Sequence, residues 1–214
     1  MSFPPFQAHA PFLLSPSSSF SGAEQQPPPL TTRDLFGATW HMIASSSTMW
    51  QDRKSSITVT YSATADGADG RDFYDVAAWS ADNSSKQHST KGLSCPAAAY
   101  SGYVYAWRGT GWLRLITTRW EVVGLGVVSH RSEADGADGA DVEDDDRGDG
   151  AVVLVTFVQK TTFSPPALSV FIRQEHLNGT QEENVVKRVV AELKSQGMES
   201  LHAEVDKLRP VPWN

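Results

Sequence analysis

The sequence predicts an all-β fold: an eight-stranded antiparallel up-and-down barrel with a C-terminal α-helix packed against its outside. Three observations support this prediction. Eight segments read as strands, with apolar residues alternating with charged or small ones in the central stretch; no helical pattern separates them, and one clear helical pattern follows the last. Strands without intervening helices pair antiparallel, because parallel pairs need crossover connections. They form either a sandwich or a closed barrel, and hairpin connections between sequence neighbours favour closure.

The stretch from residue 103 to 128 is the strongest strand signal, and we expect it to form the fifth and sixth strands. Its aromatic residues are Tyr103, Tyr105, Trp107, Trp112 and Trp120. Gly109 and Gly111 predict a bulge or bend in the first of the two strands. A tight turn is expected near residues 117–119. Long bent strands of this kind suit a sheet that curls around a cavity.

The other strands are shorter and bounded by turn residues. We expect them at residues 38–46, 57–62, 72–80, 88–95, 151–160 and 167–174. The link between the first two contains Trp50 and Arg53 and is long enough to fold over an opening of the barrel. A short helical turn is expected at residues 31–37, before the first strand.

The final element is a helix. Thr180 and Glu183 have the spacing of a capping box, and Gly197 stands where a C-terminal cap is expected. One face carries an apolar stripe: Val185, Val186, Val189, Val190 and Leu193. A second short helical or turn segment near 200–207 and an extended end follow. The stripe has to pack on apolar surface, most simply the outside of the sheet.

One folded domain is expected over residues 31–214, preceded by a disordered Pro/Ser-rich tail at 1–30. Two acidic inserts, 65–70 and 133–150, share an Ala-Asp-Gly unit and lack the ligand spacing of an EF-hand, so we expect solvated loops. The chain has net charge -7, of which residues 133–149 carry -8. The remainder is therefore near neutral, and no basic stripe indicates nucleic-acid binding.

Several chemistries find no support in the sequence. The six histidines lack metal-ligand spacing, and Gly124 and Gly126 do not complete a dinucleotide fingerprint, so no metal or cofactor is expected. No nucleophile elbow occurs, and Cys95 is the only cysteine. The N-terminus has neither a basic region nor an uninterrupted apolar run, so we expect a cytoplasmic protein without a membrane span.

With this order of elements, the chain resembles the lipocalins of the calycin superfamily. Gly37 to Trp40, with two residues between its glycine and its tryptophan, resembles the G-x-W motif at the first strand, and Arg173 matches the arginine that ends the last strand. Segments such as YAWRGTGWLRLITTRWEVVGLG look like a group of fungal lipocalin-like proteins. The resemblance implies that Arg173 stacks on Trp40 across the closed end, with hydrogen bonds to the turn before Trp40. It also implies a barrel that binds a small hydrophobic molecule.

Candidate ligand-binding residues are the aromatic and arginine side chains of the strands and the first loop. They are Trp50, Arg53, Tyr61, Tyr74, Trp79, Tyr105, Trp107, Trp112, Arg114 and Trp120. Each aromatic residue could line a pocket or pack in the core, and each arginine could line a pocket or face solvent. Tyr61, Tyr74 and Asp75 could act in acid–base chemistry if the fold brings them together.

Three hypotheses follow. The first is an intracellular barrel that binds a small apolar, aromatic or polyketide-like ligand. The second is an isomerase or cyclase that holds such a ligand in a reactive shape, because positioning alone accelerates these reactions. The third is a binding module whose partners use the N-terminal tail.

Overall fold

The computed structural model describes residues 3–14, 35–64, 72–81, 86–97, 104–130, 150–162, 164–173, 177–195 and 198–213. Eight strands form the main sheet: β2 (Thr39–Ser45), β3 (Lys54–Ala63), β4 (Phe73–Ala81), β5 (Gln87–Pro96), β6 (Val104–Gly109), β7 (Thr117–Ser129), β8 (Gly150–Val158) and β9 (Ala167–Ile172). The remaining elements are β1 (Gln7–Ala8), α2 (Thr48–Gln51), the 3₁₀ turn η1 (Gly111–Leu115), α3 (Gly179–Ser195), α4 (Glu199–Val205) and β10 (Arg209–Pro210).

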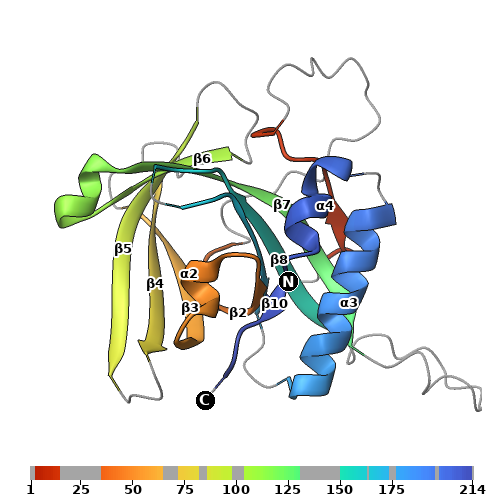
Figure 1. Ribbon diagram of the computed structural model, residues 1–214. Helices are drawn as coiled ribbons and strands as arrows, with labels where there is room; N and C mark the ends of the chain where they lie inside the picture. Colours follow the sequence, from red (N-terminus) through yellow and green to blue (C-terminus); the bar gives the residue numbers. More distant parts are fainter. Residues whose placement is uncertain are drawn as a thin grey trace, which may run out of the picture.

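The sheet closes on itself. Each strand from β2 to β9 pairs antiparallel with the next, and β9 pairs back onto β2, with His41 opposite Ile172. Closure satisfies the backbone groups of both edges, which an open sandwich would leave exposed. Figure 1 shows the ring, with α3 and α4 together on one outer side of it. The predicted barrel is confirmed.

Alternate connections of an up-and-down barrel lie at the same end. The connections β2–β3, β4–β5, β6–β7 and β8–β9 therefore share one end, which we call the mouth. The connections β3–β4, β5–β6 and β7–β8 share the opposite end, the floor. Both acidic inserts connect strands at the floor, and they lie outside the described residues except for Gly150, the first residue of β8.

Two apolar cores form because strand residues alternate between inside and outside. The inner core contains Trp40, Phe73 and Phe171. The outer core joins β8 and β9 to the buried face of α3, where Val185, Val189 and Leu193 are buried. Val186 and Val190 pack beside them, so the predicted apolar stripe is confirmed.

The start of α3 differs from the prediction. Asn178 and Gln181 exchange side-chain-to-backbone hydrogen bonds of 3.0 Å each, which is the reciprocal pattern of a capping box. The box therefore lies two residues earlier than the expected pair of Thr180 and Glu183. Glu183 instead pairs with Lys187 at 2.8 Å on the exposed face. The predicted cap at Gly197 lies outside the described residues.

The hairpin of the central stretch also turns earlier than expected. The chain reverses through η1, and Thr117 already belongs to β7 and lies opposite Arg108. Gly111 takes φ +62° at the start of η1, a left-handed value that glycine adopts without strain. The predicted turn at 117–119 is therefore wrong, while the bend at the glycines is where the chain reverses.

The N-terminal residues correct the expectation of a disordered tail, at least over residues 3–14. Gln7 and Ala8 form β1, which pairs with Leu125 and Gly124 of β7. A Cβ at Gly124 would lie 2.6 Å from the Phe6 ring, and one at Gly126 would lie 2.4 Å from the Phe6 backbone. These glycines leave the space in which the N-terminal segment lies against β7. Residues 15–34 lie outside the described part of the chain.

A buried acid–base pair lies beneath this N-terminal segment. Glu121 has no solvent-exposed surface, and its carboxylate accepts the backbone N–H groups of Phe12 and Leu13 at 3.0 and 3.2 Å. The His9 ring lies 3.6 Å away, with Nε2 2.8 Å from the Val122 carbonyl oxygen. Burial raises the pKa of Glu121 to about 7 and lowers the pKa of His9.

The expected stacking of Arg173 on Trp40 is wrong. The Arg173 guanidinium lies 5.4 Å from the centre of the Phe3 ring, on the N-terminal segment. Trp40 is fully buried at the floor, and its indole N–H donates to the Leu35 carbonyl oxygen at 3.0 Å. The turn before β2 is thus held by the indole itself. The resemblance to lipocalins did not predict that Phe3 would lie beside Arg173, and the expected partner of the guanidinium was therefore wrong.

Candidate functional site

The floor half of the barrel interior is filled by aromatic side chains. Phe73 is fully buried, and its ring meets those of Tyr61, Tyr105 and Trp120 with centroid distances of 5.7, 5.0 and 6.1 Å. Tyr61 and Trp120 stack with an interplanar angle of 19°. This half is a packed core.

The mouth half differs, because its inward-facing side chains keep contact with solvent. Strand register places Val59 opposite Ala77, Ala77 opposite Thr90 and Trp79 opposite His88. All five are half-buried, whereas the floor residues are buried. A side chain that points into a closed barrel meets solvent only where that barrel is open. The inward-facing residues near the mouth are therefore partly accessible to solvent.

Four side chains form what we call the mouth cluster: Trp50, Lys54, Trp79 and His88. Trp79 stacks on His88 at 5.8 Å and 14°, and Trp50 meets Trp79 edge-on at 5.7 Å. The Lys54 ammonium lies 5.0 Å from the Trp50 ring and 5.5 Å from the Trp79 ring. Trp50 belongs to α2, so the link between the first two strands does bring an indole over the opening, as predicted.

Lys54 carries a charge that no described carboxylate neutralises by an ion pair. Its ammonium donates to the Met49 carbonyl oxygen, and no described carboxylate lies within an ion-pair distance of 4.0 Å. Burial lowers the pKa of Lys54, and the charge of Asp52 partly opposes this change. An anionic group that entered the mouth would meet a positive charge framed by two indoles.

A buried polar network lies between the mouth and the floor. The carboxylate of Asp75 accepts the Trp107 indole N–H at 2.7 Å and the Ser94 hydroxyl at 2.8 Å. Ser94 in turn accepts the Trp120 indole N–H at 3.0 Å. Burial raises the pKa of Asp75 against the lowering effect of its two hydrogen bonds. Burial likewise raises the pKa of Tyr61, which faces Asp75 across β3 and β4.

Two glycines make room for this network. Gly92 and Gly109 face each other on β5 and β6, and the Trp107 indole lies across both. A Cβ at Gly92 would lie 1.9 Å from the indole nitrogen of Trp107, and one at Gly109 would lie 2.7 Å from the far edge of the same ring. Only glycine at position 92 lets Trp107 lie flat enough to reach Asp75.

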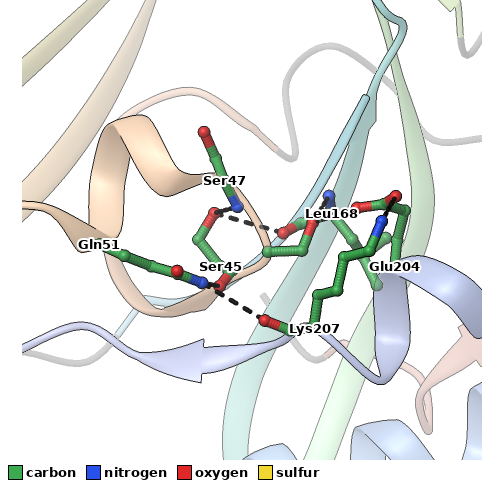
Figure 2. Close-up of polar contacts among 7 residues, drawn as sticks. Ser45, Ser47, Gln51, Leu168, Glu204 and Lys207 are labelled. Atoms are coloured by element: carbon green, nitrogen blue, oxygen red, sulfur yellow. Dashed lines mark hydrogen bonds and ion pairs between the residues drawn. The ribbon is translucent and has the colours of Figure 1, made fainter. Parts of the chain in front are cut away.

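Figure 2 shows the polar contacts that hold α2 beside the mouth. Gln51 donates to the Ser45 carbonyl oxygen at 2.6 Å. Ser46 donates to Glu204 at 2.7 Å and accepts the Leu168 N–H at 2.9 Å, while Lys207 pairs with Glu204 at 2.8 Å. The Ser46 hydroxyl thus ties the chain just before α2 to α4 and β9, and we assign these contacts a role in positioning Trp50 through α2.

The structure separates the ten sequence candidates into two groups. Those in or over the barrel interior are Trp50, Tyr61, Trp79, Tyr105, Trp107 and Trp120. Those outside it are Arg53, Tyr74, Trp112 and Arg114. Tyr74 points away from the interior because Asp75, its neighbour, points in, and its ring lies under the Lys91 ammonium at 4.0 Å. Ligand binding by any of the ten remains a prediction.

Of the proposed acid–base group, Asp75 and Tyr61 converge and Tyr74 does not. Sequence reasoning missed Lys54, Ser94 and Gly92. The period of β3 did not reveal Lys54, because the bulge between Ser55 and Thr58 changes which residues face inward. Gly92 carried no signal, because its importance depends on a ring from another strand.

Among the described residues, no group of three or more His, Cys, Asp or Glu side chains could hold a metal ion. Within the same ranges, every helix is too short or too polar to cross a membrane.

No protein-family model matches this chain, and no curated protein matches it. Solved structures do. Insecticyanin from the tobacco hornworm Manduca sexta aligns with a TM-score of 0.51 at 9% identity, over 99% of this chain and 90% of that one. Per a 4, a major allergen from cockroaches, aligns with a TM-score of 0.50 at 8% identity, over 90% of this chain and 94% of that one. At such identities the likeness shows the fold alone.

Proposed function

We propose that this chain, which has a lipocalin-like fold, binds a small aromatic or otherwise apolar molecule at the mouth of its barrel. One observation carries the proposal: inward-facing residues around Trp79 stay half-exposed inside a closed ring. Partly exposed indoles in a concavity are favourable for a flat ligand, since both faces of the ligand can be covered. The packed floor sets the depth to which such a ligand can enter.

Lys54 refines the ligand class toward molecules with an acidic group. A carboxylate or enolate on the ring system would lie near the ammonium while the ring stacks on Trp79. Because Lys54 already lies between two indoles, little side-chain freedom would be lost on binding.

The test uses two fluorescent probes of similar shape, anionic anilinonaphthalene sulfonate and neutral N-phenyl-1-naphthylamine. Trp79→Ala should raise the Kd of both probes about tenfold, since about 1.4 kcal/mol is a plausible loss of stacking and apolar contact. Lys54→Met should raise the Kd of the anionic probe about fivefold and leave that of the neutral probe unchanged. Fluorescence titration measures both.

Trp112→Ala is the matched control, because Trp112 is 74% exposed on η1 and outside the interior. Equal losses from Trp79→Ala and Trp112→Ala would contradict binding at the mouth. Equal losses of both probes from Lys54→Met would contradict the acidic-ligand class while leaving the site intact.

The convergence of Asp75 and Tyr61 favours a second candidate, an isomerase or cyclase acting on a polyketide-like molecule in the same cavity. A carboxyl group whose pKa is raised by burial holds its proton closer to neutral pH, as a general acid requires. Isomerisation conserves mass, so chromatography with mass spectrometry should show a component of a metabolite extract converted to a new peak of identical mass. Asp75→Asn should abolish that conversion and keep probe binding. Absence of any such conversion by the unaltered protein would reject the enzyme.

A further inference from the structure

The mouth end carries large apolar side chains that the fold does not bury. Trp112 is 74% exposed and Leu115 is 86% exposed, both on η1, and Met49 on α2 is 49% exposed. Of the described residues, these and Leu14 are the exposed large hydrophobic side chains. Figure 1 shows η1, in green, projecting from the barrel on the side away from α3. A protruding indole with a neighbouring leucine is costly in water unless something covers it.

Cations lie at the same end of the barrel as these apolar residues. Exposed arginines and lysines at the same end are Arg53, Arg108, Arg114, Arg119 and Lys160. The described residues of the mouth connections contain a single carboxylate, that of Asp52. The acidic segment 131–149 instead connects β7 and β8 at the floor. Among the described residues, the mouth connections therefore carry an excess of positive charge.

A groove of about 370 Å³ lies beside Leu115. It is lined by Leu115, Ile116, Thr117, Arg119, Gln159, Lys160, Thr161 and Thr162. The lining combines two cations with hydroxyl groups and an exposed leucine, and it contains no carboxylate. A phosphate oxygen would find charge and hydrogen-bond donors there next to an apolar side chain.

We propose that the mouth end docks on an anionic lipid surface. Trp112 and Leu115 enter the boundary between headgroups and acyl chains, and Arg114, Arg119 and Lys160 contact lipid phosphates. Tryptophan is favoured at that boundary, and basic residues next to it are attracted by anionic headgroups. Cations at this end outnumber the single described carboxylate, that of Asp52, and this imbalance favours an anionic surface over a protein partner of mixed charge.

Docking in this orientation places the barrel opening against the lipid. An apolar molecule could then pass between the acyl chains and the mouth cluster without crossing bulk water. Docking does not depend on the proposed ligand, since η1 and the groove lie outside the barrel interior.

The experiment is co-sedimentation of the full chain with vesicles. One set contains phosphatidylcholine with about 30 mol% phosphatidylserine, and the other contains phosphatidylcholine alone. Binding to the anionic set is expected, although the chain carries a net charge of -7 and would be repelled as a whole. The double variant Trp112→Ala/Leu115→Ala should reduce the partition coefficient at least about tenfold. Arg114→Ala should reduce it about fivefold, and 0.5 M salt should weaken binding because the Debye length falls below about 5 Å.

Two matched controls test whether the face is specific. Leu14→Ala removes a partly exposed leucine from the N-terminal segment, and Lys187→Ala removes an exposed cation from α3. Neither should change binding. Circular dichroism checks that each variant folds, which is expected because the substituted side chains are exposed.

Three results would overturn the proposal. The chain could fail to bind anionic vesicles, or Lys187→Ala could weaken binding as much as Arg114→Ala does. The apolar residues could also serve contact with a second copy of the chain. In that case, sedimentation velocity would show self-association that Trp112→Ala/Leu115→Ala abolishes, without vesicle binding.

Discussion

Replacing Gly92 by alanine is expected to destabilise the barrel by about 3 kcal/mol. The new methyl group would lie 1.9 Å from the indole nitrogen of Trp107, so the ring has to move. Movement breaks the 2.7 Å hydrogen bond to Asp75 and leaves a buried carboxylate with one donor fewer. Overpacking costs about 1–3 kcal/mol, and loss of a hydrogen bond to a buried charged group adds a similar amount.

The sign of this effect is diagnostic. Glycine weakens an ordinary strand, so alanine at a strand position without a close neighbour should stabilise. Urea denaturation would measure the loss as a lower midpoint at unchanged slope. Gly179→Ala is the control, because nothing lies within 4 Å of the Cβ it would add at the start of α3.

A double-mutant cycle locates the cause. In a Trp107→Ala background, Gly92→Ala should cost less than about 1 kcal/mol, since the ring that it collides with is gone. If the cost stays near 3 kcal/mol in that background, the close approach of Gly92 and Trp107 is not its origin.

The second large effect concerns pH. Glu121 has a pKa of about 7 in the folded chain against an ordinary value of 4.5, because burial beneath the N-terminal segment disfavours its charge. The folded protein therefore holds a proton that the unfolded chain releases between pH 4.5 and 7. Stability should fall over that window as pH rises, by up to about 3 kcal/mol, and level off above it.

Glu121→Gln should remove this slope, because an amide does not titrate and keeps one oxygen for the N–H groups of Phe12 or Leu13. His9 acts in the opposite direction: burial lowers its pKa, so its contribution is lost as pH falls through its ordinary value of 6.5. Asp75 has the same sign as Glu121 and is present in both proteins. The difference between the two stability curves therefore isolates Glu121.

Thermal or urea unfolding from pH 4.5 to 8 provides the measurement. Parallel curves for the two proteins would show that Glu121 is not protonated in the folded state. His9→Gln in the same series separates the imidazole from the carboxyl group, since the two lie 3.6 Å apart.

The sequence predicts those strands and helices of the structure in which apolar residues form a regular pattern. The short apolar runs at residues 151–158 and 167–172 predict strands, and the valine stripe of α3 predicts the face that packs on them. Both patterns record which side of an element avoids water. That local information was enough for the order of strands, and the hairpin connections were enough to favour a closed ring.

The sequence predicted only part of the candidate site. Aromatic residues on β4, β6 and β7 predicted large side chains inside the barrel. Period-2 alternation would have excluded Tyr74 once Asp75 was known to point inward. The bulge in β3 hid Lys54, and the contact of Trp107 with Asp75 depended on Gly92 in the neighbouring strand β5. The resemblance to fungal lipocalin-like proteins stays a prediction.

By itself, the sequence determined the eight strands, their antiparallel order and the closing helix, because burial on one face repeats with the period of each element. Tertiary structure alone decided three things: that residues 3–14 cover Glu121, that Arg173 meets Phe3, and that Trp107 reaches Asp75 across Gly92. Each of these contacts joins segments that are far apart in the chain. Each depends on a space that a glycine leaves open or that a side chain from another segment fills. Such a fit depends on the shapes of both surfaces once they are folded, and no local pattern encodes it.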